Sequence, residues 1–98
     1  MRRVLFTEAA RADLTEAVDW YDARAAHMVP QLQAALRAAV VRIAANPKQF
    51  PAGPHLTRRV LLRRFPYALI FREAEEDCYV VALFHMSRDP TAWRRRTR

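Results

Sequence analysis

The spacing of apolar residues changes once along this chain, and that change constrains the fold more than any other feature. Up to residue 46, apolar residues recur every three or four positions, which is the period of an amphipathic helix. From residue 58 onward the chain consists mainly of branched and aromatic runs that are typical of strands. The segment from Pro47 to His55 holds three of the six prolines and the only glycine, which predicts an irregular loop between the two parts.

The first half of the chain predicts one strand and a hairpin of two helices. Residues 3–6 form a short apolar, branched run that predicts a strand, and Thr7 can cap the helix that follows. The segment from Ala10 to Tyr21 carries one apolar stripe and a mainly acidic outer face. Pro30 suits the first turn of a second helix, and the pair Asn46–Pro47 ends that helix. The connection between the helices is short, so we expect them to be antiparallel.

The second half predicts a meander of three antiparallel strands. Pro66 and an acidic turn from Glu73 to Asp77 separate the strands. The last two strands are apolar at nearly every position, so we expect the helices to cover one face and the C-terminal segment to cover the other. In that segment Asp89 can cap a short helical turn, with Pro90 at its first position and Trp93 packed back on the sheet. The predicted strands are Arg58–Phe65, Tyr67–Arg72 and Cys78–His85.

These elements together predict an α+β fold with the order β-α-α-β-β-β. We expect a helix hairpin packed on an antiparallel sheet, with the first strand at an edge of the sheet and a short C-terminal helical turn. A chain of 98 residues has no room for a second domain, so residues 1–98 should form a single domain.

The composition excludes several classes of protein. Cys78 is the only cysteine, so neither an internal disulfide nor a cysteine-based zinc site can form. His27 and His55 lie in predicted loops with no carboxylate at a ligand spacing, so we expect no metal and no cofactor. The longest apolar run, 78–84, is too short to span a membrane, and no signal-peptide core precedes Glu8. We therefore expect a cytoplasmic protein with no membrane contact.

Arginine dominates the charge of this chain. Sixteen of the 17 basic residues are arginine, and the net charge of +7 favours polyanionic or strongly acidic partners. A GC-rich genome would also explain the choice of arginine over lysine, but it would not explain where the charges lie. Five acidic residues fall between Glu8 and Asp22, and none follows until Glu73, whereas nine basic residues lie in that interval. The charge is therefore segregated along the chain.

Four stretches, taken in order, resemble the RelE/ParE superfamily of toxins from type II toxin-antitoxin systems, especially its ParE-like plasmid stabilisation branch. The resemblance covers nearly the whole chain. Members of this family usually have glycine between the two helices, where this chain has "AAHMV". The matching stretches are "FTEAARADLTEAVDWYDAR", "ALRAAVVRIAANPKQFP", "RRVLLRRFPYALIFRE" and "VVALFHMSRDPTAWRRR".

The resemblance implies a small toxin that inhibits bacterial growth and is neutralised by a cognate antitoxin encoded by an adjacent gene. The superfamily has two mechanisms. ParE-like members poison DNA gyrase without a reaction of their own, and RelE-like members cut mRNA on the ribosome.

A metal-free ribonuclease needs a proton-transfer group and cations around the scissile phosphate. His85 is the candidate proton-transfer group because histidine titrates near neutrality, although a lone histidine at a strand end is also typical of packing or capping. Arg59, Arg72 and Arg88 are the candidate phosphate contacts. RelE-like nucleases commonly rely on lysine and arginine groups along the sheet, with a tyrosine or histidine near the C-terminus. This chain has one lysine, Lys48, in a predicted loop, and Met86 rather than tyrosine follows His85. The nuclease set is therefore incomplete.

The alternation of side chains along strands limits how many arginines can share one site. Arg58 and Arg59 should point to opposite faces, as should Arg63 and Arg64, so about one of each pair can reach a common pocket. Solvated charges at a sheet edge, which discourage strand aggregation, are the alternative interpretation for about half of these residues.

We therefore expect a ParE-like, non-catalytic toxin in a hetero-oligomer with its antitoxin. The alternative is a ribosome-dependent mRNA endoribonuclease, and a further alternative is a non-toxic basic module that binds nucleic acid. The candidate contacts for the target and the antitoxin are Arg63, Arg72, His85, Arg88, Trp93, Arg94, Arg95 and Arg96.

Overall fold

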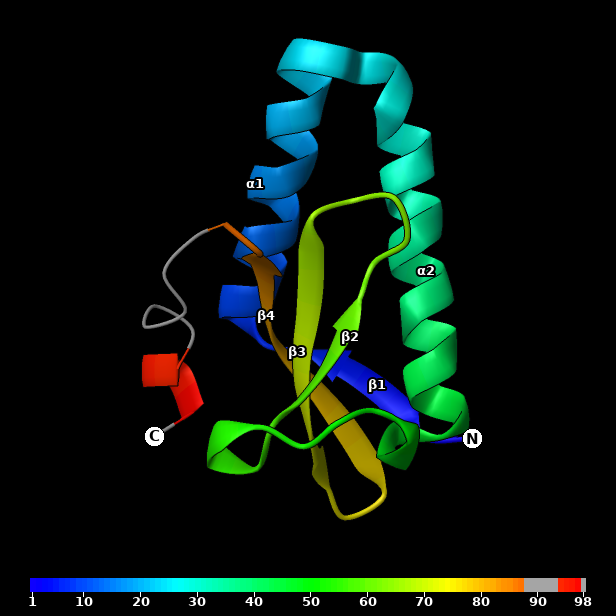
Figure 1. Cartoon of the computed structure of the whole chain (residues 1–98), viewed down its shortest axis with the longest axis vertical. Coiled ribbons are helices and arrows are strands. Elements are labelled where there is room, and N and C mark those ends of the chain that lie inside the picture. Colours follow the sequence, from blue (N-terminus) through cyan, green and yellow to red (C-terminus); the bar gives the residue numbers. More distant parts are fainter. Residues whose placement is uncertain (88–93, 98) are drawn as a thin grey trace.

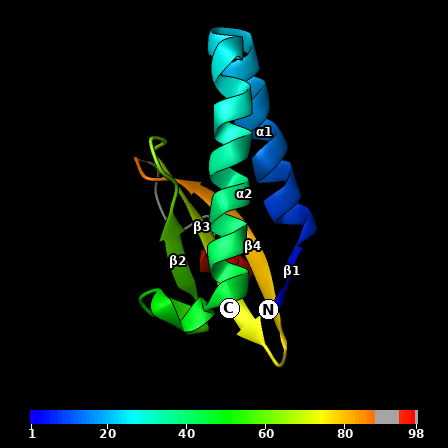
Figure 2. The same cartoon turned by 90° about the vertical axis from the view of Figure 1, so that its right-hand side faces the viewer.

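A hairpin of two long helices stands against one face of a four-stranded sheet (Figures 1 and 2). The computed structural model describes residues 1–87 and 94–97. The predicted order β-α-α-β-β-β is confirmed, and a short 3-10 turn, Arg95–Thr97, follows the last strand. The elements are β1 (Arg3–Phe6), α1 (Glu8–Ala25), α2 (Val29–Ala45), β2 (Arg58–Leu61), β3 (Tyr67–Ala74) and β4 (Asp77–His85).

The sheet has the strand order β1-β4-β3-β2. Strand β1 lies at an edge, as predicted, and pairs with β4 in parallel, from Arg3 opposite Asp77 to Phe6 opposite Val80. The β2–β3 and β3–β4 pairs are antiparallel because short turns connect them. The sheet is therefore mixed, with an antiparallel meander and one parallel edge strand.

Local signals set both ends of the helices. The Thr7 hydroxyl accepts a hydrogen bond from the Ala10 backbone N–H at 3.1 Å, which confirms the predicted N-cap of α1. A 3-10 turn, Ala26–Met28, joins the helices, and Pro30 lies in the first turn of α2. This connection contains no residue with positive φ, which explains how "AAHMV" can stand where the family usually has glycine.

Two predicted boundaries are wrong. Strand β2 ends at Leu61 rather than Phe65, because the chain must reverse before β3; Arg64 has a φ of 69° in this reversal, and the Leu62 N–H donates to the Tyr67 carbonyl oxygen at 2.9 Å. The turn between β3 and β4 is two residues, 75–76, rather than Glu73 to Asp77. Glu73 and Asp77, the two ends of the predicted turn, both belong to paired strands, so the β3–β4 hairpin is longer than expected.

Apolar side chains are buried on both faces of the sheet, as the apolar strands predicted. The larger core lies between the sheet and the helices and includes Leu32, Ile43, Leu69, Phe71 and Val80. The smaller one lies on the opposite face and consists of Ala68, Ile70, Val81 and Ala82, with Phe84 packed against it.

The C-terminal cover is only partly within the described residues. Asp89, Pro90 and Trp93 lie outside them. Arg94 lines a groove on the open face together with Ile70 and Arg59. In the described ranges, no helix has the length and apolar character needed to cross a lipid bilayer.

Cys78 lies in the helix-side core and is fully buried. Burial raises the pKa of its thiol above the usual value, so the thiolate is disfavoured. Cys78 is therefore a packing residue rather than a reactive group.

Candidate functional site

A β-bulge in β4 decides which face of the sheet carries His85. Phe71 pairs with Val80, but Ile70 pairs with Ala82, so Val81 is an extra residue without a partner in β3. The extra residue reverses the alternation of side chains beyond it. As a result Leu83, like Val80, belongs to the helix-side core, and His85 two residues later lies on the same face.

Contacts with two neighbours fix the His85 ring. It packs edge-on against Tyr67, with ring centroids 5.1 Å apart. Its Nδ1 accepts a hydrogen bond from the Ser87 backbone N–H at 3.2 Å and lies 2.7 Å from the Ser87 hydroxyl oxygen. Because Nδ1 accepts from a backbone N–H, the neutral ring carries its proton on Nε2. His85 therefore has the packing and capping contacts that a histidine at a strand end commonly makes.

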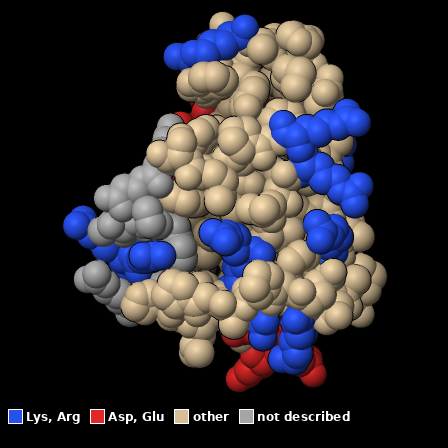
Figure 3. Space-filling model, viewed as in Figure 1, with Lys and Arg blue, Asp and Glu red and all other residues tan. Residues whose placement is uncertain are grey.

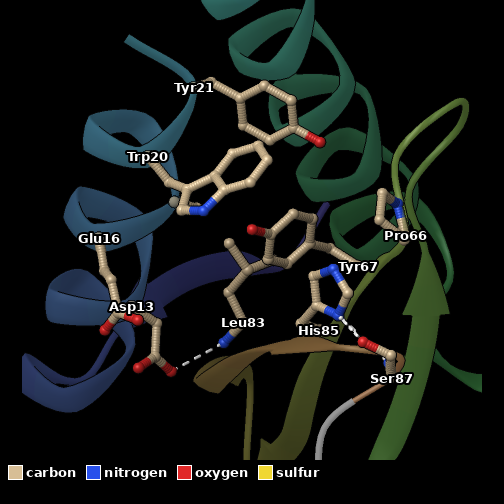
Figure 4. Close-up of a pocket in the computed structure, with 10 residues that line it drawn as sticks. Asp13, Glu16, Trp20, Tyr21, Pro66, Tyr67, Leu83, His85 and Ser87 are labelled. Carbon is tan, nitrogen blue, oxygen red and sulfur yellow. Dashed lines mark hydrogen bonds between the residues drawn. The ribbon is translucent and has the colours of Figure 1, made fainter. Parts of the chain in front are cut away.

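A groove of about 370 Å³ lies between α1 and the ends of β3 and β4, with His85 at one side (Figure 4). Aromatic rings and two carboxylates dominate its walls, and none of its described lining residues is arginine or lysine. Among the described residues, the groove therefore holds no cation that could contact a scissile phosphate. The main lining residues are Asp13, Glu16, Trp20, Tyr21, Tyr67 and His85.

Arg59 and Arg72 lie on the opposite face of the sheet. Arg59 pairs with Ile70, which belongs to the buried cluster of the open face, and Arg72 follows Ile70 by two residues on the same strand. The structure thus brings Arg59 and Arg72 to one face and places His85 on the other. Arg88, the fourth member of the candidate nuclease set, lies outside the described residues.

Several basic residues hold the fold together through two acidic residues. The carboxylate of Glu73 receives Arg2 at 3.1 Å, Lys48 at 3.3 Å and Arg58 at 3.6 Å. Arg58 also donates to the Phe50 carbonyl oxygen at 2.6 Å. Glu73 therefore ties the N-terminus, the loop after α2 and strand β2 to strand β3.

Asp77 pairs with Arg3 at 2.9 Å across the parallel β1–β4 pair. The hydrogen bond from the Arg3 guanidinium lowers the pKa of the Asp77 carboxyl below its usual value, and the same contact raises the pKa of Arg3.

Other arginines carry no such partner. Within residues 1–87 and 94–97, no acidic side chain pairs with Arg59, Arg63, Arg64 or Arg72, and all four are exposed. The predicted alternation of Arg63 and Arg64 does not apply, because both lie in the reversal after β2 rather than in a strand. Figure 3 looks onto the open face of the sheet, where basic side chains stand apart over the surface and acidic ones gather near the β3–β4 turn. The open face thus presents cations to solvent.

The C-terminal arginines have different roles. Arg96 donates to the Asp13 carboxylate at 2.7 and 3.2 Å and to the Val81 carbonyl oxygen at 3.0 Å. Asp13 also accepts the Leu83 N–H at 3.1 Å. These bonds give partners to the backbone groups of β4 beyond the point where its pairing with β1 ends. The last backbone hydrogen bond on that side runs from the Thr7 N–H to the Val80 carbonyl oxygen at 3.0 Å.

Arg96 is therefore engaged within the fold, whereas Arg95 is exposed and Trp93 lies outside the described residues. Sequence reasoning missed Asp13, because nothing in the helix pattern distinguishes it from the other acidic residues of α1.

Comparison with known proteins agrees with this geometry. The family model described as the ParE toxin of the type II toxin-antitoxin system parDE matches residues 4–90. A solved structure described as the chromosomal ParDE TA system from P. aeruginosa is similar in fold, with a TM-score of 0.75 and 20% sequence identity. The alignment covers 89% of this chain and 98% of that one. A comparison with curated protein sequences finds no match.

Proposed function

Because the chain belongs to the ParE toxin family of type II toxin-antitoxin systems, we propose that it is a growth-inhibiting toxin that poisons DNA gyrase. A cognate antitoxin, encoded by an adjacent gene, neutralises it in a hetero-oligomeric complex in the cytoplasm. The toxin unit is a single domain over residues 1–98.

The placement of His85 relative to the arginines carries the choice of gyrase over RNA cleavage. A general acid or base must lie within hydrogen-bond reach of the proton it transfers, and the cations that stabilise the transition state must contact the same phosphate. His85 faces the helices, whereas Arg59 and Arg72 project from the open face. A sheet separates these groups, so they cannot contact one phosphate. This separation supports inhibition by binding rather than by catalysis.

The proposed target surface is the open face of the sheet, where Arg59 and Arg72 have no ion pair among the described residues. Arg72 is exposed on this face, and Arg95 is exposed in the C-terminal turn Arg95–Thr97. Arg63 is exposed in the chain reversal after β2. A guanidinium binds a carboxylate or a phosphate through two parallel hydrogen bonds, so this surface suits an acidic protein or nucleic acid held by gyrase. We assign Arg96 to holding the C-terminal turn against α1 and β4, and His85 to the groove beside α1. The residues that we assign to contacts with the target or the antitoxin are Arg63, Arg72, Arg88, Trp93, Arg94 and Arg95.

The test is a DNA supercoiling and cleavage assay with purified gyrase and purified toxin. We expect inhibition of supercoiling and accumulation of gyrase-linked DNA breaks. The double variant Arg72→Ala/Arg95→Ala should weaken inhibition by at least about tenfold, since two charge-assisted contacts are lost. The matched variant Arg11→Ala/Arg24→Ala removes the same charge from α1 and should leave inhibition within about twofold.

His85→Ala separates the two mechanisms. A gyrase poison should retain growth inhibition in this variant, because the imidazole performs no proton transfer. Cleavage of mRNA within translated codons after induction, abolished by His85→Ala, would instead establish the ribonuclease.

A further inference from the structure

The groove beside α1 is opposite in charge to the chain as a whole. The net charge of the chain is +7, yet the described residues that line this groove include two carboxylates, Asp13 and Glu16, and neither arginine nor lysine. The two acidic residues are three positions apart on α1, so their side chains lie on the same side of the helix. The groove is therefore locally negative on a protein whose net charge repels cations.

Aromatic rings form much of the remaining wall. Trp20, Tyr21 and Tyr67 line the groove, and Figure 4 shows their rings to the right of the two carboxylates. The Trp20 ring contacts Tyr21 edge-on, with centroids 5.0 Å apart, and Trp20 is 46% exposed. The face of an aromatic ring attracts cations, and indole does so most strongly. Rings combined with carboxylates favour a ligand that carries both positive charge and apolar surface.

Two of these groups already hold guanidinium groups of the chain itself. The guanidinium carbon of Arg24 lies 4.5 Å from the centre of the Trp20 ring. Arg96 donates to the Asp13 carboxylate at 2.7 and 3.2 Å. Neither arginine is among the described lining residues, so both cations lie outside the groove. The same ring and the same pair of carboxylates therefore offer the chemistry that binds a planar cation to the space inside it.

The size of the groove suits a small molecule. Its volume of about 370 Å³ falls within the range of about 300–1,000 Å³ that is usual for small-ligand sites. The buried side chains of Ala17 and Leu83 add apolar surface to its lining. Size, charge and lining together favour a cation with a short hydrocarbon chain.

We propose that the groove beside α1 binds a small alkylguanidinium molecule. Its planar cation pairs with Glu16 through two parallel hydrogen bonds and lies against the Trp20 ring, while its hydrocarbon chain packs on Ala17 and Leu83. Asp13, which Arg96 holds in place, adds negative charge beside it. The groove lies on the helix side of the sheet, away from the open face to which we assign the target. The inference therefore does not depend on the proposed function.

The test is an NMR titration of the isotopically labelled full chain with butylguanidinium. Binding should shift the Trp20 indole N–H and the Leu83 amide in a saturable manner. Butylurea has a similar shape and no charge, and it should bind at least about tenfold more weakly because no ion pair forms. The absence of a saturable shift up to about 10 mM butylguanidinium, ten times a Kd of about 1 mM, overturns the inference.

A matched pair of variants on α1 tests the ion pair. Glu16→Gln keeps the size of the side chain and removes its charge, so we expect the Kd for butylguanidinium to rise about tenfold. Glu8→Gln makes the same change at an exposed position that does not line the groove, and at physiological salt it should leave the Kd within about twofold. Wild-type affinity in Glu16→Gln overturns the inference.

Two variants of Trp20 test the ring. Trp20→Leu removes the aromatic face and should raise the Kd at least about threefold, whereas Trp20→Tyr keeps a ring and should retain most of the affinity. Thermal unfolding monitored by circular dichroism shows whether each variant is folded. Unchanged affinity in folded Trp20→Leu contradicts the proposed site.

Two further outcomes would assign the groove to another occupant and overturn the inference. The peptide acetyl-Gly-Arg-Gly-amide binding at least about tenfold more tightly than butylguanidinium would indicate an arginine of a partner protein. A wild-type dimer in analytical ultracentrifugation that Glu16→Gln dissociates would indicate an arginine of a second copy of the chain. None of these measurements involves gyrase, so their failure leaves the proposed function standing.

Discussion

The two helices of the hairpin have the same length within one residue and both pack on the sheet, yet their outer surfaces are opposite in character. The outer surface of α1 is acidic, and the fold uses one of its carboxylates, Asp13, to hold Arg96 and the edge of β4. The outer surface of α2 is apolar and basic, and no described residue of the chain covers its exposed apolar side, which includes Ala38 and Val41. The comparison separates charge that stabilises the fold from charge left available to a partner.

The same distinction holds for the two faces of the sheet. On the helix face the polar groups around His85 are paired with one another, as the Ser87 contacts show (Figure 4). On the open face Arg59 and Arg72 have no ion pair among the described residues. Groups that already have partners lose those contacts when they bind elsewhere, whereas unpaired cations do not. Recognition of anionic molecules is therefore expected at the open face.

The largest expected effect is on the free energy of unfolding, and it distinguishes the buried apolar side of α2 from its exposed apolar side. Ile43→Ala removes a fully buried side chain from the buried side and should lower the free energy of unfolding by about 2–5 kcal/mol. Val41→Ala alters the exposed side and should change it by less than about 0.5 kcal/mol. Urea denaturation of both variants measures the difference. Equal losses would mean that the exposed side is packed in the isolated chain.

A smaller effect on the free energy of unfolding is expected when the Asp13 carboxylate of α1 is removed. Asp13→Ala leaves the Leu83 N–H and the Arg96 guanidinium without their acceptor, and should lower the free energy of unfolding by about 1–3 kcal/mol. It should also speed hydrogen exchange at the Leu83 amide. Asp19→Ala, at an exposed position of the same helix, should cost less than about 0.5 kcal/mol. Unchanged exchange at Leu83 would show that Asp13 does not close the edge of β4.

The smallest effect concerns the exposed pair between β1 and β4. Because the Arg3 hydrogen bond lowers the pKa of Asp77, the pair contributes stability at pH values above the usual aspartate pKa, and this contribution is lost as the pH falls through the lowered value. Arg3→Ala should raise the pKa of the Asp77 carboxyl toward its usual value in an NMR titration. An unchanged pKa would mean that the pair does not persist in solution.

Much of the fold could be predicted from short-range signals. The bounds of β1, the Thr7 cap, Pro30 in the first turn of α2 and the end of that helix before Pro47 all depend on residues that are close in sequence. Backbone geometry at a cap or a proline depends on the residue itself and its immediate neighbours, so these predictions succeed. The sequence pattern predicts too long a strand β2, because branched and basic residues continue past Leu61, where the strand ends and the chain turns.

The candidate site was less predictable. Alternation correctly places Arg58 and Arg59 on different faces, but it cannot reveal that Val81 is an extra residue. The bulge interrupts the pairing of β4 with β3, and it decides whether His85 faces the helices or the arginines. Nor did the spacing of acidic residues on α1 identify Asp13 as the partner of Arg96, which follows 83 residues later.

The sequence by itself determined which segments are helices and strands, that the apolar strands are buried on both faces, and that cations concentrate in the middle and at the end of the chain. Only the tertiary structure decided which of these charges meet. Periodicity and capping act over a few residues, whereas the facing of His85 and the pairing of Arg96 depend on the register between strands and helices far apart in the chain. That register separates histidine from arginine and leaves the outer apolar side of α2 exposed.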